Sequence, residues 1–172
     1  MVRLIGACLI LFAGTMLGFY QALQLSRRPR QIRQLVQALQ RLETEISYGF
    51  TPLPSALLTI SRQIPQPLSQ LFHQVGEQLA GSGELTTEES WRSAIDNCWQ
   101  HTAMKSTEKE AFLQLGLTLG ITDREDQIKH LRLTASQLQT EELTAGEEQK
   151  RYEKMWKSLG LLSATLVVIL MY

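Results

Sequence analysis

Two uncharged apolar runs stand at the two ends of the chain. The first starts at residue 4 and extends through two glutamines to residue 25, and a membrane-spanning helix needs about 20 residues. The second, residues 158–172, matches the bilayer thickness only if residues 155–157 are added, with the Lys157 amine reaching back to the interface. We therefore expect transmembrane helices over 4–25 and 158–172. A cleaved signal peptide is the alternative for the first run, and a buried core helix for the second.

Between these runs, apolar residues recur every three or four positions, which is the period of amphipathic helices. We expect an all-α fold in which residues 26–157 form an antiparallel bundle of six helices. An even number of antiparallel helices returns both ends of the bundle to one side, as two spans in one membrane require. The loops expected at the membrane end are 65–66 and 102–106, and those expected at the distal end are 49–51, 81–86 and 120–122.

Helix starts and stops have their own signals in the sequence. Thr86 with Glu89, and Thr107 with Glu110, each place a hydroxyl and a carboxylate three residues apart, which is typical of a capping box. The other expected caps and stops are Thr51, Pro52, Asp123, Gly49 and Gly120.

The chain is formally neutral, but its charge is sorted into three blocks. Residues 1–41 carry +6, residues 42–149 carry −9 and residues 150–172 carry +3. Cytoplasmic flanks of membrane spans are rich in Arg and Lys, so we expect a cytoplasmic bundle with both termini on the opposite side of one membrane. Solvated helix ends are the alternative. The residues expected to meet anionic headgroups are Arg27, Arg28, Arg30, Arg33, Lys150, Arg151, Lys154 and Lys157.

Residue patterns for catalysis or cofactor binding are missing from the sequence. It holds no phosphate-binding glycine loop, dinucleotide fingerprint, zinc-protease motif or serine-hydrolase motif. The three histidines fall on three different predicted helices, and Cys98 lies on an apolar helix face, where core packing is the favoured role. The neutral total charge gives no reason to expect nucleic-acid binding. We expect a protein that is not an enzyme, with no cofactor, metal or small-molecule substrate.

Pairs of small residues four positions apart lie within both apolar runs. They are Gly14 with Gly18, and Gly160 with Ala164. This spacing lets helices approach closely in lipid, either within one chain or between copies in a homo-oligomer. Gly116 and Gly120 repeat the spacing outside the spans, where a helix stop is the better interpretation.

Short motifs also stand in a recognisable order along the chain. They are Arg28 to Arg33, Leu42 to Gly49, Thr51 to Leu53, Leu119-Gly120, Asp123-Arg124, Gln127, His130, Tyr152 to Met155 and Lys157 to Gly160. Together they resemble the stage III sporulation protein AB family over the whole length, least distinctly at residues 54–110.

The resemblance implies a membrane protein of endospore-forming bacteria, placed in the mother-cell membrane around the forespore. It would be a non-enzymatic platform subunit of the channel complex between the two cells, which is similar to a secretion system. Its bundle would look like the six-helix domain of type II secretion and type IV pilus platform proteins. The companion stage III sporulation protein AA, a cytoplasmic ATPase, is the expected partner. The alternative is a membrane-anchored helical adaptor or sensor for a small ligand or another protein.

Two of the family motifs fall at distal turns of the expected bundle, although they are far apart in the sequence. We expect them to line a shared groove for partner binding. The alternative is that they are helix caps and stops, a role for which Tyr48 and Arg124 are not needed. The residues are Tyr48, Gly49, Thr51, Pro52, Gly120, Asp123 and Arg124.

Overall fold

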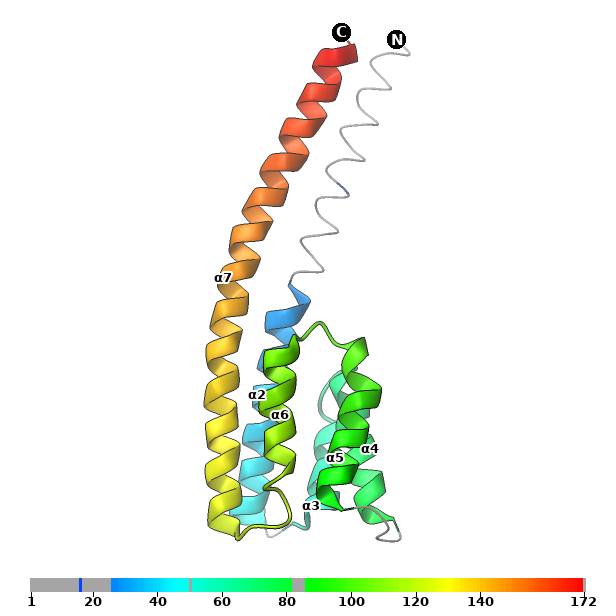
Figure 1. Ribbon diagram of the computed structural model, residues 1–172, viewed down its shortest axis with the longest axis vertical. Coiled ribbons are helices and arrows are strands. Elements are labelled where there is room, and N and C mark those ends of the chain that lie inside the picture. The colour runs from blue at the N-terminus through cyan, green and yellow to red at the C-terminus, as the bar shows by residue number, and fades with distance from the viewer. Residues whose placement is uncertain (1–15, 17–25, 50, 82–85, 172) are drawn as a thin grey trace. The chain divides into compact units, whose positions relative to one another are not determined.

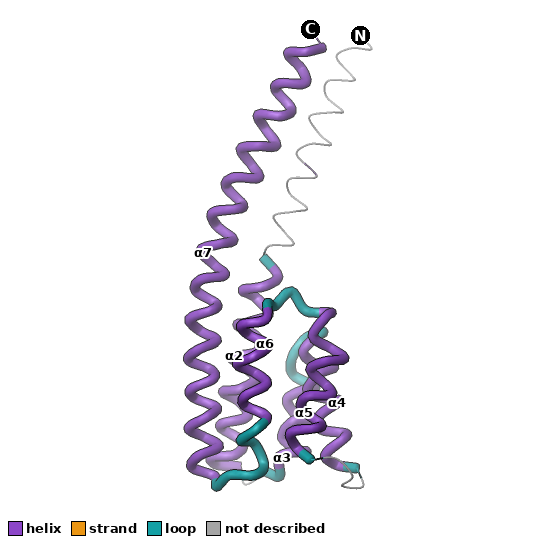
Figure 2. The backbone as a smooth tube through the Cα atoms, in the orientation of Figure 1, coloured by secondary structure: helices purple, strands orange, loops and turns teal. Residues whose placement is uncertain are grey.

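The computed structural model describes residues 16, 26–49, 51–81 and 86–171. Their regular structure is entirely helical (Figure 1, Figure 2), which confirms the all-α expectation for this part of the chain. The elements are α2 (Arg27–Thr44), the π-helical turn η1 (Glu45–Gly49), α3 (Leu53–Ser61), α4 (Leu68–Ala80), α5 (Thr87–Cys98), the 3₁₀ turn η2 (Trp99–His101), α6 (Ser106–Gly116) and α7 (Arg124–Met171).

By its contacts the chain divides into two units. One is residues 28–143, which holds α3 to α6, nearly all of α2 and the first part of α7. The other is residues 1–27 together with 144–172. The fold and the candidate site below concern the unit of residues 28–143. The predicted domain limits, 26–157 between two spans, stay a prediction.

Neighbours in sequence pack against each other, α3 with α4, α4 with α5 and α5 with α6. Polar contacts show that α2 and the first part of α7 run antiparallel. Arg28 meets Glu141 near the start of α2, and Arg132 meets Glu43 near its end. Residues early in α2 thus pair with residues later in α7, and residues late in α2 with residues earlier in α7. This is the antiparallel arrangement that the helix count predicts.

The core is built from the helix faces that the periodicity predicts. Ile32, Leu35 and Leu39 of α2 are fully buried. An aromatic cluster joins α4, α5 and α6, because the Trp91 ring lies 4.7 Å from the Phe112 ring and 6.3 Å from the Phe72 ring, centroid to centroid. The Trp91 indole N–H donates to the carbonyl of Phe112 at 2.7 Å, so this large side chain is buried with its one donor satisfied.

The predicted caps have mixed outcomes. The Thr86–Glu89 capping box at the start of α5 is confirmed, and so is the Asp123 cap, whose Oδ1 accepts from the Asp126 N–H at 2.9 Å. The box of Thr107 with Glu110 is wrong. Helix α6 begins at Ser106, and the Glu108 carboxylate accepts the N–H of Lys105 at 2.9 Å. A threonine three residues before a glutamate is common within helices. Here the carboxylate that accepts the N–H at the helix start belongs to the buried Glu108, not to Glu110.

Two predictions concern the apolar ends. Among the described residues, no helix combines the length and the apolar content that crossing a membrane requires. The first predicted span, 4–25, lies outside the described residues apart from Met16, and so do Gly14 and Gly18. Gly160 and Ala164 belong to α7, but the surroundings of their side chains are outside the description.

Candidate functional site

Helix α2 ends at Thr44, and the chain continues as the π-helical turn η1, which ends at the predicted stop, Gly49. A π-helical turn often marks functional positions in proteins. Within this turn Ile46 points into the core, while the Tyr48 side chain is 82% exposed. An aromatic ring held in solvent at a helix end is available for contact with another molecule.

Arg124, at the start of α7, is bonded to the end of that turn. Its Nε donates to the Ile46 carbonyl at 2.7 Å, and its Nη2 donates to the Ser47 carbonyl. Carbonyls at a helix end lack intrahelical N–H partners, so a guanidinium that reaches two of them holds the turn in place. The expectation that capping does not need Arg124 is therefore wrong: Arg124 caps α2 from another helix.

A hydrogen bond between Thr51 and Glu45 lies beside the π-helical turn, next to Gly49. The Thr51 hydroxyl donates to Glu45 Oε2 at 2.8 Å, and it caps no helix. Pro52 is the residue before α3, and no side chain caps that helix start. A Cβ on Gly49 would lie 2.8 Å from Thr51 Oγ1 and 2.9 Å from Glu45 Oε2. Glycine at this position therefore leaves room for the Glu45–Thr51 hydrogen bond.

Gly120 shapes the turn between α6 and α7. Its φ of +81° is a left-handed conformation that residues with a side chain rarely adopt. The predicted stop is misplaced, because α6 already ends at Gly116 and Gly120 lies in the turn that follows. A Cβ there would lie 2.7 Å from Thr87 Oγ1, so the same glycine lets the turn lie against the start of α5. Asp123 then caps α7, and Arg124 follows directly.

These contacts place the two family motifs at one end of the residue 28–143 unit, as the sequence predicts. We call this end the turn surface. It comprises Tyr48, Gly49, Thr51, Pro52, Gly120, Asp123 and Arg124. The predicted cap role holds for Asp123, Gly120 shapes the turn after α6, and Arg124 adds a cap that the sequence did not reveal. Tyr48 has no such structural duty in the contacts above, and its binding role stays a prediction.

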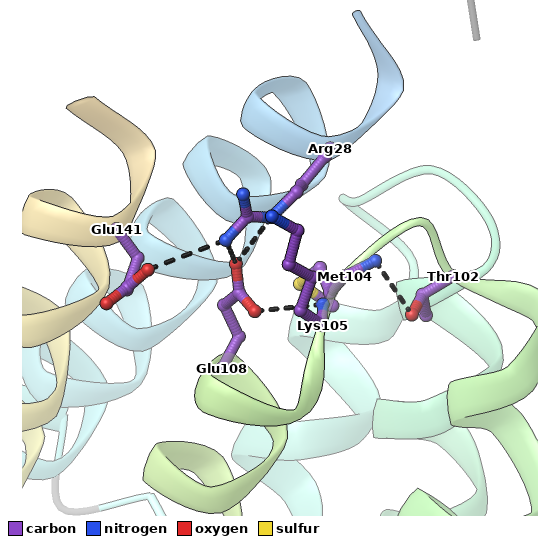
Figure 3. A network of polar contacts seen from close by, with 6 residues as sticks. All are labelled: Arg28, Thr102, Met104, Lys105, Glu108 and Glu141. Atoms are coloured by element: carbon purple, nitrogen blue, oxygen red, sulfur yellow. Dashed lines mark hydrogen bonds and ion pairs between the residues drawn. The ribbon is translucent and has the colours of Figure 1, made fainter. Parts of the chain in front are cut away.

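A buried ionic network joins α2, α6 and α7 (Figure 3). Arg28 donates from Nε at 2.9 Å and from Nη2 at 2.6 Å to Glu108 Oε1, and its Nη2 lies 3.5 Å from Glu141 Oε2. The other Glu108 oxygen is the one that accepts from the backbone of Lys105. In the loop beside it, the Met104 N–H donates to Thr102 Oγ1 at 3.3 Å. Glu108 is 0% exposed, so its charge is balanced within the protein.

This network corrects one predicted membrane-interface residue. Arg28 is only 9% exposed and is bound to two carboxylates, so it is not a headgroup contact in this conformation. A buried Glu108 carboxylate needs a cation beside it, and Arg28 provides that charge. Arg33 is exposed but paired with Glu142 at 2.7 Å. The lipid contacts of the other basic residues stay predictions; Arg27, Arg30, Lys150, Arg151 and Lys154 are exposed, and the Lys157 side chain lies outside the description.

No arrangement for metal binding occurs among the described residues, where three or more His, Cys, Asp or Glu side chains nowhere converge. His73, His101 and His130 are exposed on three separate elements. Cys98 is buried, and burial raises the pKa of its thiol, which disfavours the reactive thiolate. Its Sγ lies 3.5 Å from Gln74 Oε1, consistent with the packing role expected from the sequence.

Comparison with known proteins identifies the family. Residues 3–172 match the family model described as stage III sporulation protein AB. The chain belongs to this family. The stage III sporulation protein AB of Bacillus subtilis (strain 168) is 42% identical over 171 residues, covering 99% of both chains.

A solved structure of a family member supports the fold as well. It is described as stage III sporulation protein AB and has a TM-score of 0.68 and 42% identity to this chain. The match covers 73% of this chain and 98% of that chain. The resemblance read from the short motifs is therefore confirmed, and membership supports a role in sporulation.

Proposed function

We propose that this sporulation protein is a non-enzymatic platform subunit of the channel complex between mother cell and forespore. Residues 4–25 and 158–172 anchor it in the mother-cell membrane, and the helices between them lie in the mother-cell cytoplasm. The turn surface, at the end away from the membrane, binds the companion stage III sporulation protein AA ATPase. The apolar runs, the basic flanks and the family resemblance support this arrangement.

The observation that carries the proposal is the bond from Arg124 to the end of α2. The guanidinium holds the turn that presents Tyr48, so an exposed aromatic ring stands on a fixed backbone. Exposed tyrosines on rigid supports are frequent energetic centres of protein interfaces, because burying them on binding costs little side-chain freedom. Two motifs that belong to separate helices thus form one surface that a partner can recognise.

The basic flanks supply the membrane side of the proposal. With Arg28 removed from the set, the headgroup contacts are Arg27, Arg30, Arg33, Lys150, Arg151, Lys154 and Lys157. Each adds about 1 kcal/mol of attraction near an anionic surface. The small-residue pairs would join the two spans within one chain or between copies.

The alternative of an adaptor for a small ligand has less support. The buried charged groups Arg28 and Glu108 pair with each other, so neither is available to a ligand. Two grooves among the described residues, one between α5 and α6 and one on α7, are both open to the surface. A platform needs no interior ligand site.

The test compares Tyr48→Ala with Leu133→Ala in sporulating cells. Both side chains are large and exposed, but Leu133 lies on α7 and is not part of the turn surface. We expect Tyr48→Ala to reduce co-purification of the AA ATPase and the count of heat-resistant spores, while Leu133→Ala leaves both near wild type. Arg124→Glu is a less specific variant, because it also removes two bonds to the end of α2. Normal ATPase recovery and spore counts in Tyr48→Ala, at normal protein levels, would exclude this surface as the docking site.

A further inference from the structure

A groove outside the turn surface runs between α5 and α6. It has a volume of about 250 Å³. The lining residues are Glu88, Arg92, Glu110, Leu113, Gln114 and Leu117. The groove was not predicted from the sequence, and the contacts that form the turn surface use none of its lining residues.

The floor of the groove is apolar and open. Leu113 and Leu117 stand one helical turn apart at the C-terminal end of α6, and Leu117 is 46% exposed. Pairs of apolar residues at this spacing on a helix normally face a core or a partner. A groove of this size fits one or two apolar side chains of another molecule.

A close contact between α5 and α6, the two helices that form the groove, holds them in place. A Cβ on Gly116 would lie 2.5 Å from Trp91 Cδ1, so the end of α6 packs directly against the Trp91 side chain of α5. Trp91 is itself held by its bond to the Phe112 carbonyl. The groove is therefore a preformed feature of the helix pair, and a ligand would not have to order it.

The rim of the groove is acidic. Glu88 and Glu110 stand on opposite helices, and Arg92 lies 3.4 Å from the Glu88 carboxylate, which offsets its charge. The lining residues sum to one negative charge within a segment, residues 42–149, that carries −9. An acidic rim around an apolar floor favours a ligand with the reverse pattern of charge.

We propose that this groove binds a basic amphipathic helix of a partner protein. Two apolar side chains of that helix, one turn apart, rest on Leu113 and Leu117, and a lysine or arginine beside them pairs with Glu110. A helix fits because the two walls are themselves helices, whose surfaces accept the ridge of a third. The site is separate from the turn surface, so the protein presents two contact areas to its partners.

The test uses the full-length protein in nanodiscs of neutral lipid and two designed helical peptides of roughly 16 residues. One peptide carries two leucines one turn apart flanked by lysines, and the other carries glutamates in place of the lysines. Fluorescence anisotropy gives the two dissociation constants. We expect the lysine peptide to bind, and the glutamate peptide to bind at least about tenfold more weakly.

Two pairs of variants locate the binding. Glu110→Lys should weaken the lysine peptide about fivefold, while Glu77→Lys, the same charge change at an exposed residue of α4, should not. Leu117→Ser should weaken it about tenfold, while Leu133→Ser on α7 should not. Circular dichroism melts confirm that each variant is folded. Equal binding of both peptides overturns the proposal, because the groove would then not select for charge. Equal effects of Glu110→Lys and Glu77→Lys also overturn it, and would leave only a general attraction to the acidic segment of residues 42–149. Normal binding by folded Leu117→Ser also overturns it.

Discussion

At the scale of single residues, Glu108 has two tasks at once. One of its oxygens accepts a backbone N–H at the start of α6, and the other accepts two bonds from Arg28. A carboxylate that is 0% exposed is stable only with such partners. This explains why an arginine in a basic cluster next to a predicted span turns inward while its neighbours Arg27 and Arg30 stay exposed. The charge pattern alone did not distinguish among these arginines.

Removing the Glu108 carboxylate should therefore be costly. Glu108→Ala leaves Arg28 buried beside Glu141 alone, and we expect the free energy of unfolding to fall by about 3 kcal/mol. Urea unfolding of the full chain in detergent measures it. Glu110→Ala, two residues further along the same helix and exposed, is the matched control and should change stability by less than about 0.5 kcal/mol. Equal losses in the two variants would show that the buried pair contributes nothing specific.

The Glu89 carboxylate should make stability depend on pH at the acid end. The backbone N–H and the hydroxyl of Thr86 both donate to it and hold its pKa below the ordinary value of 4.5. A lowered pKa in the folded state means that this stabilisation is present above 4.5 and is lost as pH falls through the folded pKa. An NMR titration of the Glu89 carboxyl carbon should give a midpoint below 4.5 in the wild type and a higher one in Thr86→Val. An unchanged midpoint in Thr86→Val would mean that the hydroxyl plays no part.

At the scale of elements, the helices could be predicted because each carries a local signal. The apolar period located α2 to α7, and the Thr86–Glu89 spacing located the start of α5. Features that arise from tertiary contact escaped prediction. The π-helical turn is bonded to Arg124 from a helix far along the chain, and Gly116 was predicted only to be part of a helix stop. In the structure Gly116 also allows α6 to approach Trp91.

The role of Gly116 can be checked against a second helical glycine. In Gly116→Ala the new Cβ meets the Trp91 side chain at 2.5 Å, so we expect a loss of about 1–3 kcal/mol in stability. In Gly146→Ala the new Cβ has nothing within 4 Å, and alanine favours a helix, so we expect a gain of about 0.5–1 kcal/mol. Thermal melts of the two variants should shift in opposite directions. A shift of the same sign in both would contradict the close α5–α6 contact.

At the scale of the whole molecule, the neutral total charge conceals an ordered arrangement. The described residues confirm a helical protein of a sporulation family, and the platform proposal accounts for the basic blocks that flank both apolar runs. A membrane topology could be predicted from the counts of Arg and Lys near the apolar runs, and it stays a prediction. The contact surface for a partner could be predicted only in part, because binding depends on which side chains the fold leaves exposed. The turn surface was expected from the two family motifs, whereas the α5–α6 groove became visible only when distant residues were brought together.

The proposed topology has a direct test at position 81. Gly81, an exposed residue at the end of α4, lies at one of the loops predicted to be cytoplasmic. A Gly81→Cys variant should react with a membrane-impermeant maleimide in inverted vesicles and remain unlabelled in intact protoplasts. The buried Cys98 serves as an internal control that stays unlabelled in both. Labelling of position 81 in intact protoplasts but not in inverted vesicles would show that the orientation is the reverse of the proposed one.

The central claim is that the turn surface contacts the AA ATPase, and a photocrosslinking residue at position 48 tests it most directly. In sporulating cells the account predicts a crosslinked product that contains both proteins, and no such product from the same residue at position 133, which is also exposed. Absence of the product at position 48, or equal yields at both positions with the protein at its normal level, would contradict the account.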